Sequence, residues 1–235
     1  MKNDSVVIES ALSKPRAHSE NLVPMIQAAL NYGELHARDL SGIIVSKGPG
    51  SYTGLRIGVS TAKGLAFSHN LDLVSVSSLH GLATGTLPHT TAGDIIVVGF
   101  NSRRNEVYLG MFLHDDNDVV EPLADIASLR EDEIFPFISD HVQRVKKMRP
   151  NQTPNIILAG EGAAFIATCM EEANHPPQQV LGSHLVRPSA SLIATLGAAR
   201  HKNGLIDALD SFEPFYLNEF IPKSRKKTIF DRLPF

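Results

Sequence analysis

A glycine-rich loop, Gly48-Pro-Gly-Ser-Tyr-Thr53, has the residue types that can bind a phosphate group. It follows a short apolar run, Gly42-Ile-Ile-Val45, which reads as a buried strand, and it precedes a helix rich in small residues. Such loops bind phosphate because glycine lets the backbone approach an anion and the free N–H groups of the next helix favour negative charge. The candidate contacts to a phosphate or nucleotide are therefore Gly48, Gly50, Ser51 and Thr53.

The spacing of this loop departs from both common phosphate motifs. The dinucleotide pattern G-x-G-x-x-G needs glycine at Thr53, but the glycine comes one residue later, at Gly54. The P-loop pattern needs Lys followed by Ser or Thr, where this chain has Leu55 and Arg56. The spacing therefore favours a structural tight turn over an anion site, and both interpretations stay open.

Other reactive groups do not form a recognisable active site. No two of the ten histidines are four residues apart, so the helical His-x-x-x-His metal pair is absent from the sequence. Cys169 lies in the apolar segment 165–170, where a buried and inert thiol is expected. We therefore expect no metal ion, no cofactor of its own and no catalytic residue.

The helix expected over 53–69 carries small residues at regular spacing. Gly54, Gly58, Ala62 and Ala66 recur every four residues. Glycine inside a helix costs about 1 kcal/mol relative to alanine, and close approach of another element usually offsets that cost. That element is either part of this chain's own core or a second subunit docked on the helix.

A second helix, expected over Asn21–Tyr32, is apolar on more than one face. Leu22, Ile26 and Ala29 follow the spacing of one buried stripe, whereas Val23 and Leu30 lie off it. Such a helix is either enclosed within the protein or partly exposed for a partner. Pro24 fits only the first turn of a helix, which favours a start near Asn21.

Strands and helices alternate along the chain and predict an α/β fold. Strands are expected at 5–10, 73–76 and 155–159, a hairpin at 95–100 and 106–113, and helices at 127–145 (broken at Pro136) and 190–200. The stretch Gly85–Gly93 is the best boundary between lobes. The expected division is 1–91, 92–204 and a C-terminal segment and basic tail, 205–235.

Composition is that of an ordinary globular protein. The 235 residues carry a net charge of −3, which gives no overall attraction to nucleic acid. A single cysteine excludes an internal disulfide and fits a reducing cytoplasm. No apolar run reaches membrane-spanning length, so no membrane partner is expected.

Several motifs together resemble one family, the bacterial tRNA threonylcarbamoyladenosine biosynthesis proteins TsaB (YeaZ-like members of the glycoprotease superfamily). The specific motif is the Gly48–Ala66 signature; supporting motifs are Arg16-Ala-His-Ser-Glu20, Val74-Ser-Val-Ser-Ser-Leu79 and Arg103-Arg-Asn-Glu-Val-Tyr108. The resemblance runs from about Val6 to about Leu217. It implies a two-lobed fold of the actin/hexokinase/heat-shock ATPase (ribonuclease H-like) type.

The resemblance also implies a role without catalysis. Proteins of this family support a catalytic subunit, TsaD, which transfers a threonylcarbamoyl group to the adenosine next to the tRNA anticodon, and a P-loop ATPase, TsaE, completes the assembly. Contact with tRNA would be indirect, and a homodimer formed without the partner stays open. The residues expected at the partner interface are His18, Leu22, Ile26, Ala29, Gly54, Arg56, Gly58 and Ala62.

Two departures from the family pattern stand out. The chain begins at what resembles the family's third strand, Val6–Glu9, so we expect an incomplete N-terminal lobe, either because the start codon is assigned too late or because a partner completes the sheet. Asn101-Ser-Arg103 replaces Asp-Ala-Arg, and an amide cannot act as a base.

Three further interpretations come from the residues. A small-molecule kinase of the same superfold, using Gly48–Thr53 for phosphate, is the alternative function; a peptidase ranks last because the chain lacks both a metal pair and a nucleophile. The basic run Lys223–Lys227 is either a solvated tail or a phosphate contact.

Overall fold

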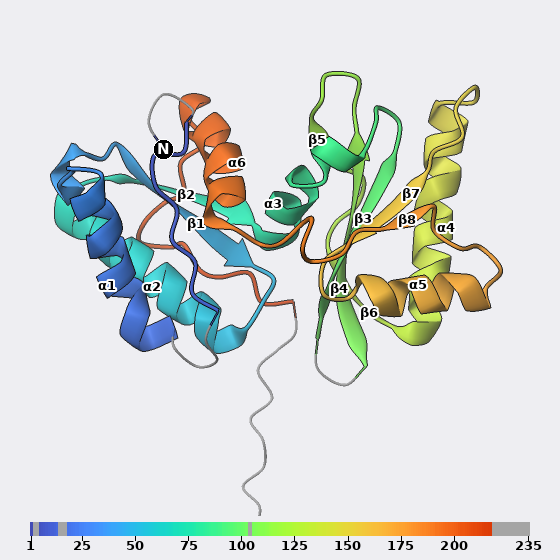
Figure 1. Cartoon of the computed structure of the whole chain (residues 1–235), viewed down its shortest axis with the longest axis horizontal. Coiled ribbons are helices and arrows are strands. Elements are labelled where there is room, and N and C mark those ends of the chain that lie inside the picture. Colours follow the sequence, from blue (N-terminus) through green and yellow to red (C-terminus); the bar gives the residue numbers. More distant parts are fainter. Residues whose placement is uncertain (2–4, 14–17, 103–104, 218–235) are drawn as a thin grey trace, which may run out of the picture.

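The protein contains two β-sheets that lie side by side with helices around each (Figure 1). The computed structural model describes residues 1, 5–13, 18–102 and 105–217. The first half of the molecule contains the sheet of β1 (Gly42–Gly48) and β2 (Asp72–Ser77) with helices α1 (His18–Tyr32) and α2 (Tyr52–His69). The short helix α3 (Ser78–Thr84) leads into the second half.

The second half is built on a sheet whose central strand is β3 (Ile95–Asn101). Its strand order is β5-β4-β3-β7-β8, and β6 also pairs with β4. The bounds are β4 Glu106–His114, β5 Val120–Pro122, β6 Ala127–Arg130, β7 Ile156–Ala159 and β8 Gln179–Val180. Helices α4 (Glu131–Met148) and α5 (Ala163–Glu172) cover one face, and α3 covers the other.

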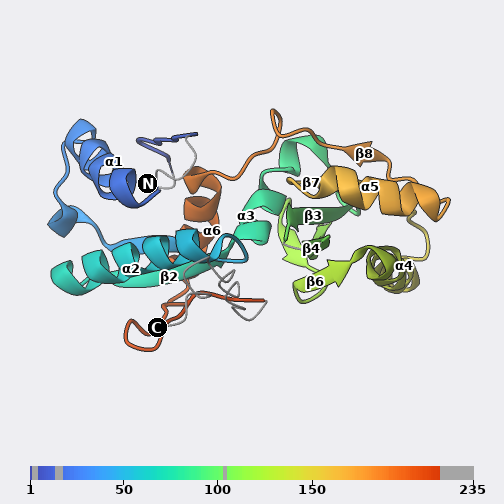
Figure 2. The same cartoon turned by 90° about the horizontal axis from the view of Figure 1, so that it is seen from below.

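The chain then returns to the first half. Helix α6 (Ala190–Lys202) packs against β1, β2 and α3, and Figure 2 shows α6 beside α3 where the two halves meet. The segment after α6 also stays with the first half, since Leu209 and Phe212 pack against the α2–β2 core. The expected division at 1–91 and 92–204 remains a prediction, although α6 belongs by sequence to the second range and by contact to the first half.

Several expected elements are present. Helix α2 begins after its Ser51 cap and ends at His69, where Asn70 adopts the expected left-handed conformation (φ 52°). The hairpin pairs Ile95 with Leu113 in an antiparallel ladder. Ser189 caps α6, as expected, by accepting a hydrogen bond from the Leu192 N–H. These predictions are confirmed because capping and alternation are local properties.

Three expectations are wrong. Residues 6–10 lie outside any strand, and Val6 and Val7 are 46% and 53% exposed, because no neighbouring strand in the described part of the chain pairs with them. Helix α1 begins at His18, so Pro24 lies beyond its first turn. Helix α4 begins at Glu131 and continues through Pro136, because its apolar face is buried against the second sheet and offsets the lost hydrogen bond.

Among the residues that the structure describes, no helix is long and apolar enough to cross a membrane.

Candidate functional site: the glycine loop and the α1–α2 surface

The glycine loop joins the end of β1 to the start of α2. Gly48 has a φ of +111°, and a Cβ there would lie 2.9 Å from the Phe215 carbonyl oxygen. Both the conformation and the close approach require glycine. Ser51 Oγ accepts a hydrogen bond from the Gly54 N–H at 3.4 Å and so caps α2. These contacts explain Gly48 and Ser51 without a ligand.

Nothing comparable constrains the other two loop residues. A Cβ on Gly50 would meet only Leu55, at 4.0 Å, and Thr53 is exposed on the first turn of α2. The tight-turn interpretation therefore has a physical basis in this chain. A phosphate or nucleotide contact through Gly48, Gly50, Ser51 and Thr53 stays a prediction.

The small residues of α2 divide into an open end and a buried end. A Cβ added to Gly58 or Gly64 would meet no atom within 4 Å, and one on Gly54 would meet only Ser51 of its own helix end. Ala62 and Ala66, in contrast, are 5% and 0% exposed and pack with Leu73 of β2. No element within the described chain therefore makes a close approach to the glycines of α2.

The close approaches that glycine permits occur elsewhere in the fold. A Cβ on Gly197 of α6 would overlap Ile44 of β1, and a Cβ on Gly81 of α3 would lie 2.6 Å from the Ile193 Cδ1 atom. Gly85 is similarly close to Leu192, at 2.8 Å. Sequence reasoning missed these three glycines; the four-residue spacing of Gly81 and Gly85 is the signal that pointed to them.

Helices α1 and α2 contact each other and expose large apolar side chains. Tyr32 is 82% exposed, Phe67 is 78% exposed and Val23 is 58% exposed. The stripe residues Leu22, Ile26 and Ala29 of α1 are half-buried. We call this exposed area the α1–α2 surface, made up of Leu22, Val23, Ile26, Ala29, Tyr32, Gly54, Gly58 and Phe67.

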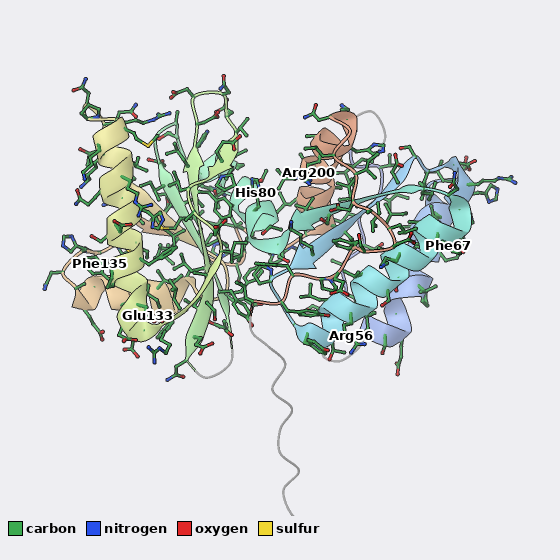
Figure 3. The ribbon with its side chains drawn as sticks, turned by 180° about the vertical axis from the view of Figure 1, so that it is seen from behind. Arg56, Phe67, His80, Glu133, Phe135 and Arg200 are labelled. Atoms are coloured by element: carbon green, nitrogen blue, oxygen red, sulfur yellow. The ribbon has the colours of Figure 1, made fainter. Side chains whose placement is uncertain are left out.

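Arg56 extends from the start of α2, and Phe67 lies near its end (Figure 3). The Arg56 Nη1 donates a hydrogen bond to the Tyr52 hydroxyl at 3.2 Å, and its guanidinium lies 5.5 Å from the centre of that ring. Tyr52 in turn lies 4.9 Å from the ring of Tyr216 in the C-terminal segment. Sequence reasoning missed both tyrosines, because Tyr216 is far away along the chain.

The structure thus places seven of the eight expected interface residues on two adjoining helices. Ala62 differs from the others, since it faces the core of this chain. The eighth, His18, is the first residue of α1, and its side chain lies outside the described part of the structure, as does the basic run Lys223–Lys227. The role of all these residues in binding a partner stays a prediction.

Reactive side chains in the second half have structural roles. Cys169 is 6% exposed, and burial together with the charges of Glu131 and Glu172 raises the pKa of its thiol, which stays protonated. The Asp94 carboxylate accepts hydrogen bonds from the N–H and hydroxyl of Thr91 and from the Asn155 amide. Across residues 1, 5–13, 18–102 and 105–217, no three His, Cys, Asp or Glu side chains gather to hold a metal ion.

The fold defines the class of protein first. It matches a crystal structure from Pseudomonas aeruginosa, described as an uncharacterized protein with similarity to peptidase YeaZ, with a TM-score of 0.70 and 22% identity over 87% of this chain and 86% of that one. The structure of YeaZ from the same organism gives a TM-score of 0.64 with 21% identity over 85% of each chain. The chain therefore has the mixed α/β fold of the YeaZ structures.

The sequence then defines the family. Residues 11–224 match the family described as TsaD: tRNA N6-adenosine threonylcarbamoyltransferase, and the chain belongs to this family. Relatives named tRNA threonylcarbamoyladenosine biosynthesis protein TsaB include that of Bacillus subtilis, 38% identical over 48% of this chain and 48% of the relative. The Escherichia coli protein is 32% identical over 50% of each chain. The Haemophilus influenzae protein is 27% identical over 86% of this chain and 80% of the relative.

The resemblance to TsaB proteins that the motifs indicate is thus confirmed. The matched part spans about half the length of the Bacillus and Escherichia relatives.

Proposed function

We propose that this chain is a non-catalytic subunit that supports threonylcarbamoyl transfer to the adenosine next to the anticodon in tRNA, by activating a TsaD-like catalytic subunit. The observation that carries the proposal is the α1–α2 surface. It combines exposed Tyr32 and Phe67 with Gly58, around which an added Cβ would meet nothing within 4 Å. The TsaB relatives support the choice of pathway.

The surface suits a protein partner for two physical reasons. Exposed aromatic side chains beside half-buried aliphatic ones mark interaction sites, because a partner removes their area from water. Glycine on the outer face of a helix lets a second helix approach closely. Arg56, held over Tyr52, adds a residue type common at the centres of protein interfaces.

The wider assembly follows from the same proposal. The two halves would correspond to the lobes of an actin/hexokinase/heat-shock ATPase-like fold. A TsaE-like ATPase would join through the catalytic subunit, and tRNA would be contacted indirectly. Without its partner, the chain would form a homodimer through the α1–α2 surface. This role places the protein in the cytoplasm.

The test is copurification of the full chain with its TsaD-like subunit. Gly58→Leu should abolish copurification, because the added side chain occupies space that the partner helix needs. The free variant should keep its melting temperature, because no atom of this chain lies within 4 Å of the new Cβ. Lys147→Leu, a matched change on the exposed face of α4, should leave the complex intact.

An unchanged complex with Gly58→Leu would contradict the interface. Steady turnover of any substrate by the purified chain alone, including Mg-ATP with an acceptor as the kinase alternative requires, would contradict the non-catalytic role.

A further inference from the structure

Helix α3 forms the joint between the two halves. Its apolar side faces the second sheet, where it buries Leu79, Leu82 and Ala83. Its glycine side faces α6, which packs on the first sheet; a Cβ on Gly81 would lie 2.6 Å from Ile193 Cδ1. A joint between helices with so little side chain between them allows one helix to slide along the other, the movement by which packed helices reorient domains.

His80 ties α3 to the second half. Its Nε2–H donates to the Val120 carbonyl of β5 at 2.7 Å, and its ring stacks on Phe112 with the centroids 5.2 Å apart. The next residue on β5, Glu121, is exposed. The position of Glu121 at the joint is therefore fixed by a hydrogen bond from α3.

Arg200 approaches the same histidine from the first half. It lies seven residues after Ile193, two turns further along the face of α6 that contacts α3. Burial lowers the pKa of His80, the Glu121 charge raises it and the Arg200 charge lowers it further. Figure 3 shows His80 and Arg200 where the halves meet. Two opposite charges, one on each half, therefore flank His80.

Arg200 has no partner in this arrangement. Its Nε is buried and makes no hydrogen bond within the described chain, and no carboxylate there lies within ion-pair distance. Its neighbour His201, in contrast, pairs with Asp72 of β2 at 2.7 Å. A buried N–H without an acceptor costs about 1–3 kcal/mol, so a conformation that supplies one is favoured at this point.

We propose that Arg200 and Glu121 form a latch between the two halves, which closes when α6 slides along α3 and brings the Glu121 carboxylate onto the Arg200 guanidinium. The structure corresponds to the open latch. Closure supplies the missing acceptor to Arg200 and fixes the orientation of the first half, which carries the α1–α2 surface, relative to the second sheet. The latch does not depend on the identity of any partner.

The test measures the distance between the halves in the full chain. Spin labels on Ser60→Cys of α2 and Lys147→Cys of α4, both exposed, report that distance in a Cys169→Ala background. The distance distribution should contain a closed component. Glu121→Gln and Arg200→Gln should each reduce the closed fraction about threefold, and the double variant should reduce it no further, as expected for one partly exposed ion pair.

The charge-swapped protein, Glu121→Arg with Arg200→Glu, should recover the closed component. Asp140→Asn, which breaks the 2.6 Å pair with Arg144 on the surface of α4, serves as the control and should leave the distribution unchanged. Glu121 is exposed, so its variant folds even if replacing Arg200 destabilises the chain. A distribution that Glu121→Gln leaves unchanged, or a swap that fails to restore closure, overturns the proposal.

Discussion

The same tripeptide, Ile-Ile-Val, occurs in a strand of each sheet with different results. In β3, Ile95, Ile96 and Val97 are all 0% exposed. In β1, Ile43, Ile44 and Val45 are only half-buried. Strand β3 has β4 on one edge and β7 on the other, whereas β1 pairs only with β2 in the described part of the chain. The comparison shows that neighbouring strands, rather than the tripeptide itself, decide how much apolar area leaves water.

The difference has an energetic consequence. Apolar area removed from water contributes about 25 cal/mol per Å², so identical side chains stabilise the second sheet more than the first. A parallel pair of strands is usually enclosed by further strands and by helices on both faces. The first sheet has its helices but only two strands, so we expect it to open locally before the second.

The largest effect should come from matched truncations in the two sheets. Ile96→Ala should lower the free energy of unfolding by about 4 kcal/mol, because a fully buried side chain leaves a cavity, and Ile43→Ala by only about 1–2 kcal/mol. Urea denaturation followed by circular dichroism gives both values. Equal losses would show that the two strands are equally enclosed in solution.

Matched glycine replacements should have opposite signs. Gly197→Ala should destabilise the protein by about 1–3 kcal/mol, because its Cβ would overlap Ile44 and force β1 and α6 apart. Gly58→Ala should stabilise the free chain by up to about 1 kcal/mol, because alanine favours the helix and the site is open. The same denaturation experiment applies. A loss of stability for both variants would place a close neighbour at Gly58.

The caps of helices in the first half should have a smaller effect. Ser189→Ala should cost about 1 kcal/mol, because its hydroxyl oxygen accepts the Leu192 N–H at the start of α6, at 3.3 Å. Hydrogen exchange should quicken in α6 and β1 before it does in β3. If exchange quickens uniformly, the two halves unfold as one unit.

The smallest effect concerns pH. His80 has a pKa below its ordinary value of 6.5, chiefly because of burial, so the unfolded chain binds its proton more readily than the folded one. Stability from this group is complete above pH 6.5 and falls as the pH drops below that value, until the folded histidine is itself protonated. His80→Gln should flatten this part of the stability profile in denaturation at a series of pH values. An unchanged slope would mean that other groups cause it.

Local features of the fold could be predicted from the sequence. The αL conformation of Asn70, the Ser189 cap and the Ile95–Leu113 hairpin pairing follow from residue types within a few positions of one another. The family motif could also be read in the same way. Errors arose where distant packing overrode a local rule, as at Pro136, whose helix continues because its apolar face is buried.

The candidate site shows the same limit. Spacing alone indicated that the α2 glycines adjoin another element, and it could not say whether that element belongs to this chain. The structure leaves Gly58 open and places the tight helix contacts at Gly81 and Gly197. Tyr216 could not be assigned to Tyr52 from the sequence, since 163 intervening residues have to fold before the rings meet.

The sequence by itself determined the strand–helix alternation, the caps, the glycine loop and the family, because each depends on short-range backbone preferences or on a contiguous motif. Only the tertiary structure decided which Ile-Ile-Val strand is enclosed, which glycines are crowded, and that α6 returns to the first sheet and leaves Arg200 beside His80. Burial and close approach are properties of segments far apart in the chain, and they exist only once those segments have packed together.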